Sequence, residues 1–180
     1  ATANGIKVLS VNLLLKDDGA PVVWRGPLIS GTIKQFWEDG AWDGLDFAVV
    51  DLPPGTADAP LTVMQSIQVD GILAVTMPQS LSTMIVQKQI NLGKMMNVPL
   101  LGLVENMSYA ACPHCGERWD LFGSSHREEI EKLFNLKTLA RIPVDQKLAE
   151  LGDEIKADLQ RENRGLTDIV TDLQMNKPRI

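Results

Sequence analysis

Short apolar runs alternate with helix-like patterns along this chain of 180 residues, and the alternation restricts the folds open to it. The runs have the length and β-branched content of strands that are buried on both faces. Strands that alternate with helices of this length form βαβ units, so we expect an α/β fold with a mostly parallel, doubly wound sheet and helices on both faces. The predicted strands cover residues 6–11, 47–50, 71–76, 99–104 and 138–142.

Apolar residues at helical spacing predict the helices that connect these strands. The predicted helices cover residues 28–38, 59–67, 80–96, 125–134, 146–151 and 166–174. No repeat, low-complexity tract or linker interrupts the pattern, so we expect residues 1–180 to form a single domain. A cysteine-containing segment at about 108–123 is expected as an insertion in that domain.

The charge and hydropathy of the chain exclude several classes of partner. Its net charge is −6, which argues against a nucleic-acid surface because phosphate binding needs a basic face. No apolar run reaches the roughly 18 residues of a membrane-spanning helix, and the first residues lack the features of a secretion signal. We therefore expect a cytoplasmic protein with neither a membrane nor a nucleic acid as partner.

The predicted strand at 47–50 ends at Asp51, and a Pro-Pro-Gly turn follows it directly. Ligands of open α/β sheets lie outside the carboxyl ends of the strands. Asp51 could there hold Mg²⁺ through water, and the amide of Gly55 could approach a terminal phosphate. On position alone, an Asp that only turns the chain after a core strand is an equally good interpretation.

A second polar residue, Asn106, follows the predicted strand at 99–104. Its carboxamide can offer both a donor and an acceptor to the edge of an adenine. An Asn after a strand is more often a turn residue, so this position alone supports only a hypothesis.

The chain has two cysteines, Cys112 and Cys115, in the sequence Cys-Pro-His-Cys-Gly. Two thiols at this spacing can grip one metal, and Gly116 allows the backbone to fold back over the sulfurs. A thioredoxin-like redox pair is the other interpretation, but that motif opens a helix, whereas these residues suggest a hairpin return. His114 and His126 could add nitrogen ligands. The simplest completion is a second copy of the chain, giving a four-thiolate site that suits Zn²⁺ or an iron–sulfur cluster about equally.

Together these motifs resemble the Mrp/ApbC family of iron–sulfur cluster carriers, within the MinD/ParA-like P-loop ATPases. The resemblance runs from about residue 6 to about residue 152. It rests on the motifs at 24–27 (Trp-Arg-Gly-Pro), 51–56 (Asp-Leu-Pro-Pro-Gly-Thr), 58–62, 104–109 and 112–116.

The resemblance implies roles for the candidate nucleotide residues. Asp51 would be the Walker B or switch II carboxylate, and Gly55 the γ-phosphate sensor. Asn106 would read the adenine, with Pro143 and Asp145 lining the base. ATP with Mg²⁺ is therefore an implied ligand.

The resemblance also implies that Cys112 and Cys115 bridge a [4Fe–4S] cluster between the two subunits of a homodimer. ATP binding would then change how the cluster is retained and passed to apo-proteins. Two alternatives remain open: a dimer in which the cysteines form a structural zinc clip, and a MinD/ParA-like positioning ATPase. The predicted helix at 166–174 disfavours the latter because Asp168 and Asp172 make its polar face acidic.

Two departures from the family pattern affect the expected activity. Ala57 stands where family members carry a Gly, a small change in the turn. The phosphate-binding loop G-x-x-x-x-G-K-[ST] has no match, since the pair Gly93-Lys94 lies inside a predicted helix and lacks the leading Gly. We expect the family's first strand, loop and helix to precede residue 6. The 180 residues alone are then expected to bind ATP weakly and not to be a competent ATPase.

Overall fold

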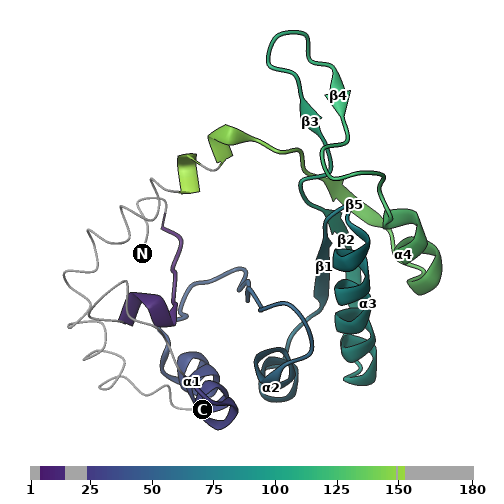
Figure 1. Cartoon of the computed structure of the whole chain (residues 1–180). Coiled ribbons are helices and arrows are strands. Elements are labelled where there is room, and N and C mark those ends of the chain that lie inside the picture. The colour runs from purple at the N-terminus through teal and green to yellow at the C-terminus, as the bar shows by residue number, and fades with distance from the viewer. Residues whose placement is uncertain (1–4, 15–23, 149, 153–180) are drawn as a thin grey trace. The chain divides into compact units, whose positions relative to one another are not determined.

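The computed structural model describes residues 5–14, 24–148 and 150–152 (Figure 1). The contacts of the chain divide it into two compact units, one made of residues 1–50 with 146–180 and the other of residues 51–145. Each unit is described by itself below. The single domain expected from the sequence stays a prediction.

The unit of residues 51–145 contains a parallel sheet of three strands in the order β1-β2-β5. These are β1 (Ile72–Thr76), β2 (Leu100–Glu105) and β5 (Thr138–Arg141). Both pairs are parallel. The strands expected at 71–76, 99–104 and 138–142 are therefore confirmed, as is the α/β class with a parallel sheet.

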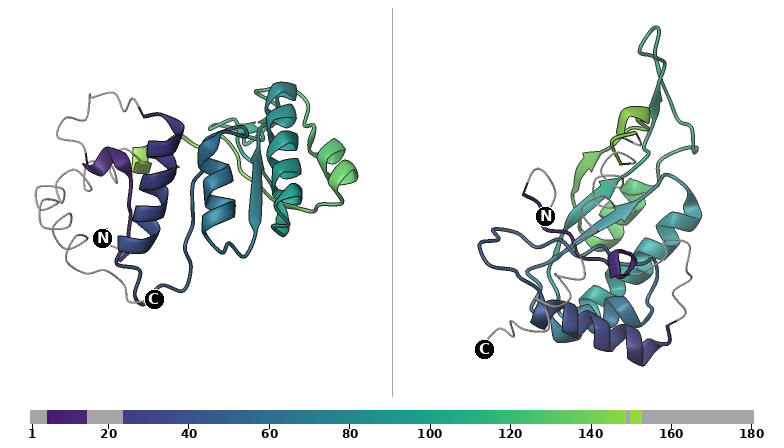
Figure 2. Two further views of the ribbon diagram at one scale, coloured as in Figure 1. Left: turned by 90° about the horizontal axis from the view of Figure 1, so that it is seen from below. Right: turned by 90° about the vertical axis from the view of Figure 1, so that its left-hand side faces the viewer.

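Three helices belong to the same unit: α2 (Asp58–Ser66), α3 (Ser80–Met95) and α4 (Arg127–Phe134). They confirm the helices expected at 59–67, 80–96 and 125–134. Helix α3 packs on β1 and β2, and α4 packs on β2 and on α3 (Figures 1 and 2). The buried apolar residues between these helices and the sheet are Ala74, Val86, Ile90, Leu103, Ile130 and Phe134.

Alternate residues of β1 show the two faces of this sheet. Ala74 and Thr76 are buried, whereas Leu73 and Val75 are 48% and 51% exposed. Helices α3 and α4 cover the sheet face that carries Ala74 and Thr76. Among the described residues, the opposite face with Leu73 and Val75 stays exposed to solvent.

The cysteine segment forms a second, antiparallel sheet of two short strands, β3 (Ala110–Ala111) and β4 (Arg118–Trp119). This hairpin lies between β2 and α4 in the sequence, and Figure 1 shows it beyond the ends of β1, β2 and β5. The hairpin return expected around Gly116 is confirmed.

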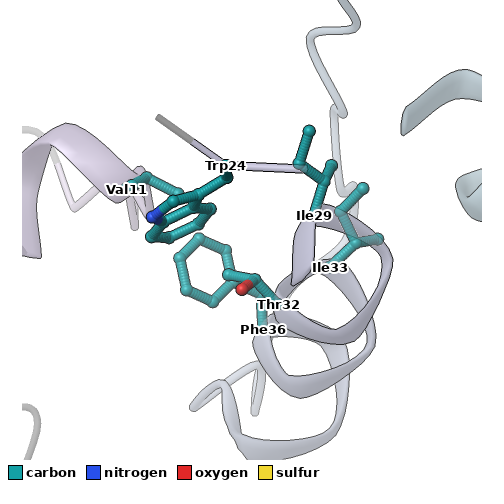
Figure 3. A pocket seen from close by; sticks show the side chains of 6 residues that line it. All are labelled: Val11, Trp24, Ile29, Thr32, Ile33 and Phe36. Carbon is teal, nitrogen blue, oxygen red and sulfur yellow. The ribbon is translucent and has the colours of Figure 1, made fainter. Parts of the chain in front are cut away.

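In the other unit, a 3₁₀ helix, η1 (Val11–Leu14), and helix α1 (Gly26–Asp39) are described. Helix α1 confirms the helix expected at 28–38. It lines an open, mostly apolar cavity of about 250 Å³ formed by Val11, Trp24, Ile29, Thr32, Ile33 and Phe36 (Figure 3).

The predictions of strands at 6–11 and 47–50 are wrong for the structure as described. Residues 6–10 and 47–50 have no regular secondary structure, and Val11 begins the 3₁₀ helix. Phe47 and Val49 are 88% and 93% exposed. An apolar run becomes a strand only when a neighbouring strand supplies its hydrogen bonds, and none does so in the described ranges.

At the end of the described chain, residues 146–148 and 150–152 are helical, in agreement with the helix expected at 146–151. The helix expected at 166–174 lies outside the described residues. Among the described helices, none is both long and apolar enough to cross a membrane.

Candidate functional site

The carboxyl ends of β1 and β2 are tied together at Asn106. Its backbone N–H donates to the carbonyl of Thr76, with 2.8 Å between nitrogen and oxygen. Its side-chain Oδ1 accepts a hydrogen bond from the N–H of Met107 at 2.9 Å, and Met107 turns the chain with a φ of 50°. A carboxamide oxygen has two lone pairs, so Asn106 keeps both donor and acceptor capacity toward a ligand. Asn106 therefore turns the chain at the carboxyl end of β2, in agreement with the turn interpretation, and its role toward adenine stays a prediction.

Backbone hydrogen bonds continue beyond the carboxyl ends of β2 and β5. They bring Pro143 to the same end of the sheet as Asn106. The N–H of Ser108 donates to the carbonyl of Ile142 at 2.9 Å, and the N–H of Val144 donates to the carbonyl of Tyr109 at 2.8 Å. Pro143 is half-buried and Asp145, two residues on, is exposed. The structure thus places the segment with Pro143 and Asp145 alongside the segment that begins at Asn106.

Asp51 and Gly55 lie in an irregular segment that leads into α2. Gly55 has a φ of 92°, a conformation that favours glycine. The segment contacts α3, where Nε2 of Gln89 donates to the carbonyl of Pro53 at 3.2 Å. Gln89 lies in the second half of α3, which starts at the carboxyl end of β1. No hydrogen bond or ion pair between Asp51 and Asn106 is present within the described ranges. Backbone hydrogen bonds therefore bring the segments of Asn106, Pro143 and Asp145 together, and the segment 51–55 is tied to α3 through Gln89. A shared site for Asp51 and Asn106 stays a prediction.

The two cysteines occupy the turn of the β3–β4 hairpin. The N–H of Cys112 donates to the carbonyl of Glu117, and the N–H of Gly116 donates to the carbonyl of Cys112, both at 2.9 Å. Gly116 has a φ of 75°, so this return uses the conformational freedom of glycine. Because the motif lies in a hairpin and opens no helix, its setting differs from that of a thioredoxin-like redox pair.

The turn also lowers the pKa of one of its cysteine thiols. The backbone N–H of Cys115, followed by that of His114 and by the thiol of Cys115, holds the pKa of the Cys112 thiol below its usual value, and burial opposes this effect. Cys112 is half-buried and Cys115 is exposed. Thiolates are the form of cysteine that binds metal, so a turn that stabilises a thiolate favours metal binding.

The hairpin supplies two sulfur ligands. Within the described part of the chain, no group of three or more His, Cys, Asp and Glu side chains is arranged to hold a metal ion. His126, considered as a nitrogen ligand from the sequence, instead approaches Glu129, with 3.1 Å from Nδ1 to Oε1.

A polar cluster around the buried carboxylate of Glu105, between the sheet and the hairpin, was not expected from the sequence. Glu105, the last residue of β2, is fully buried, and its Oε2 accepts a hydrogen bond from Nε of Arg141 at 2.9 Å. Its other carboxylate oxygen accepts a hydrogen bond from the hydroxyl of Ser125. The guanidinium groups of Arg118 and Arg141 lie over the ring of Tyr109, 4.6 and 5.9 Å from its centroid. A charged residue at the end of an apolar strand was the only signal of this cluster in the sequence.

Comparison with known proteins gives consistent results. The model of the ParA family described as "NUBPL iron-transfer P-loop NTPase" matches residues 1–175. An iron–sulfur cluster carrier protein of Methanocaldococcus jannaschii is 46% identical over 154 residues, which cover 85% of this chain and 53% of the relative. One of Pyrococcus horikoshii is 44% identical over 148 residues, covering 82% of this chain and 50% of the relative. The chain thus spans about half the length of these relatives.

A solved structure is also similar. It is a nucleotide-binding protein from Archaeoglobus fulgidus in complex with ADP, and it matches with a TM-score of 0.64 and 41% sequence identity. The match covers 73% of this chain and 54% of that protein. The expected P-loop NTPase-like fold is therefore confirmed.

Proposed function

The chain belongs to the ParA family of NUBPL iron-transfer P-loop NTPases, and from this membership we propose that it acts in an ATP-dependent iron–sulfur cluster carrier. The carrier holds a cluster between two copies of the chain and delivers it to apo-proteins. The observation that carries this proposal is the two-thiol turn at Cys112 and Cys115, which is closed by the backbone hydrogen bonds of Cys112 with Glu117 and Gly116. Relatives up to 46% identical are named iron–sulfur cluster carrier proteins.

The cluster site needs more ligands than one hairpin offers. Iron–sulfur clusters are held by four thiolates, and each chain has two cysteines. A homodimer with Cys112 and Cys115 of both copies supplies the four, and we propose a [4Fe–4S] cluster in this position. The hairpin suits this geometry because its turn lies beyond the ends of the sheet strands (Figure 1).

We propose the edge around Asn106 as the site of the nucleotide base. Asn106 would read the adenine, and Pro143 and Asp145 would line it. The similarity to a protein with bound ADP supports this assignment. Asp51 and Gly55 are proposed as the Mg²⁺ and γ-phosphate residues. They act in ATP hydrolysis only with a phosphate-binding loop, and these 180 residues contain none.

We propose apo iron–sulfur proteins as the acceptors of the cluster. We propose the cytoplasm as the compartment, because its reducing conditions keep a pair of thiols free to bind metal.

Anaerobic reconstitution tests the carrier function. Iron and sulfide added to the reduced chain should give a dimer that absorbs visible light, with about one cluster for two chains. The variant with Cys112→Ser and Cys115→Ser should hold no cluster. The variant His114→Ala changes the side chain between the two cysteines and should load normally. Full iron and sulfide content in the double serine variant would contradict the proposal.

A structural zinc clip is the second candidate, and the same turn favours it, since Zn²⁺ also takes thiolates held by a hairpin. The loaded dimer separates the two candidates. A carrier transfers iron and sulfide to an apo-ferredoxin, whereas a zinc clip keeps its metal and leaves the acceptor inactive.

A further inference from the structure

The cysteine hairpin is too small to hold its own position. Each of its strands has two residues, and isolated two-stranded hairpins are at best marginally stable in water. A turn that must present two thiolates in a fixed direction therefore needs an anchor outside the hairpin. The structure shows such an anchor at the root of β3, where Tyr109 precedes Ala110.

Two arginine side chains contact the ring of Tyr109, one from the hairpin and one from the parallel sheet. Arg118 belongs to β4, and its guanidinium carbon lies 4.6 Å from the centroid of the Tyr109 ring. Arg141 ends β5, and its guanidinium carbon lies 5.9 Å from the same centroid. One aromatic ring thus contacts a cation of the hairpin and a cation of the parallel sheet.

The cation from the sheet is itself held in place. Arg141 and Glu105 are paired residues of β5 and β2, and Glu105 is fully buried. Its carboxylate accepts from Nε of Arg141 at 2.9 Å and from the hydroxyl of Ser125. A buried carboxylate with these partners fixes the guanidinium more firmly than an exposed ion pair would.

The backbone around Tyr109 is fixed to the same edge. Ser108 is buried, and both its N–H and its hydroxyl donate to the carbonyl of Ile142, at 2.9 and 3.0 Å. The carbonyl of Tyr109 accepts from the N–H of Val144 at 2.8 Å. The backbone of Tyr109 is therefore hydrogen-bonded to the parallel sheet, while its ring contacts Arg118 of β4.

We propose that Tyr109 is a positioning residue for the cysteine hairpin: its ring, held at the sheet edge, binds Arg118 and so fixes the direction in which Cys112 and Cys115 point. The contact is made by the face of the ring and not by the hydroxyl, which has no hydrogen-bond partner among the described residues. Phenylalanine should therefore replace tyrosine here, whereas leucine should not. The inference rests on the proposed function only for its consequence, metal retention, and not for the positioning itself.

Backbone ¹⁵N relaxation of the reduced, metal-free chain measures the positioning directly. In the wild type and in Tyr109→Phe, we expect order parameters near 0.85 for the amides of Cys112 and Gly116, as for rigid backbone. In Tyr109→Leu and in Arg118→Gln, those two amides should fall below about 0.6, while Ala74 and Leu103 in the sheet stay unchanged. Unchanged sheet amides show that each variant is folded. Arg118 is not part of the parallel sheet, so its substitution leaves that sheet intact.

Dissociation of Co²⁺ from the cysteines, followed by the thiolate-to-metal absorption band, measures the consequence. An exposed cation–π contact corresponds to about a two- to fivefold change in an equilibrium or rate constant. We expect Co²⁺ to leave Tyr109→Leu and Arg118→Gln faster by that factor, and to leave Tyr109→Phe at the wild-type rate.

The outcomes separate the two proposals. Hairpin amides that stay as rigid in Tyr109→Leu and Arg118→Gln as in the wild type would overturn the positioning role. Hairpin amides that loosen as expected, in a protein whose wild type never loads or transfers a cluster, would support the positioning role and contradict the carrier function.

Discussion

The carboxylate of Glu105 and the guanidinium of Arg141 meet across the β2–β5 pair, with 2.9 Å between Oε2 and Nε. The side chain of Glu105 is fully buried, whereas that of Arg141 is 40% exposed. Because the two residues are paired in a parallel ladder, their side chains lie on the same face of the sheet. This arrangement makes the buried charge dependent on a partner that water can reach.

The first prediction follows from this asymmetry. Arg141→Ala leaves the buried carboxylate of Glu105 with the Ser125 hydroxyl but without its cation, and should lower the free energy of unfolding by about 1.5–3 kcal/mol. Arg141→Lys should lose less, since a cation remains. Urea unfolding followed by circular dichroism measures both. The control is Glu105→Gln with Arg141→Ala, because the double variant removes the charge that was left unpaired. If it is no more stable than Arg141→Ala alone, the buried charge is not the cause.

The second prediction concerns pH. The Cys112 thiol has its pKa lowered by the backbone N–H of Cys115 first, then by that of His114 and by the Cys115 thiol. The pKa of the Cys112 thiol is therefore lower in the folded chain than in the unfolded chain, where it is about 8.5. Ionisation of this thiol stabilises the folded chain, and the effect is complete above the unfolded pKa. The added stability is lost as the pH falls through the folded pKa.

Alkylation of Cys112 by iodoacetamide measures this shift. The variant Cys115→Ser isolates the Cys112 thiol and keeps the backbone N–H that has the largest effect. Its alkylation rate should reach half of its maximum at a lower pH in the native chain than in concentrated urea. Identical profiles in the two conditions would show that the turn does not stabilise a thiolate.

The third prediction uses one chemical change at two helical glycines. Gly31 lies in α1, where an added Cβ meets nothing within 4 Å, so Gly31→Ala should stabilise the chain by up to about 1 kcal/mol. Gly93 lies buried in α3, where an added Cβ would come within 2.5 Å of Cδ1 of Ile72. Cδ1 is the end of a flexible side chain and must turn aside, so Gly93→Ala should leave the chain less stable than Gly31→Ala does, by about 1 kcal/mol. Thermal unfolding of the two variants measures this difference, and an equal gain of stability in both would contradict the packing of α3 on β1.

Much of the unit of residues 51–145 could be predicted from the sequence. Apolar periodicity located β1, β2, β5 and the helices between them, because each of these elements buries the side that its pattern marks. The same reasoning failed at 47–50, which has an equally apolar pattern. There Phe47 and Val49 stay exposed, because no strand pairs with this run in the described residues.

The candidate site likewise has one part that the sequence predicts and one part that it does not. The position of Asn106 follows from one rule, that ligands lie at the carboxyl ends of strands, and the structure places it there. The contacts of Glu105 do not follow from any local pattern. Its partner Arg141 is 36 residues away, and the pairing depends on the register of two strands and on an irregularity between Leu103 and Val104. A tertiary contact of this kind becomes visible only when the register is known.

The last prediction tests the edge around Asn106 as a site for adenine. The substitution Asn106→Asp keeps an oxygen that can accept from the N–H of Met107, now seen at 2.9 Å, and so should keep the turn. It removes the amide donor that an adenine acceptor would use. Millimolar ATP should shift the amide resonances of Asn106 and Ile142 in the wild type, and the apparent affinity should fall about two- to tenfold in the variant. Asn91→Asp is the matched control, because it makes the same change of charge at an exposed position of α3 outside the proposed site. If ATP shifts the wild type and Asn106→Asp at the same concentrations, Asn106 does not read the base, and the adenine site lies elsewhere.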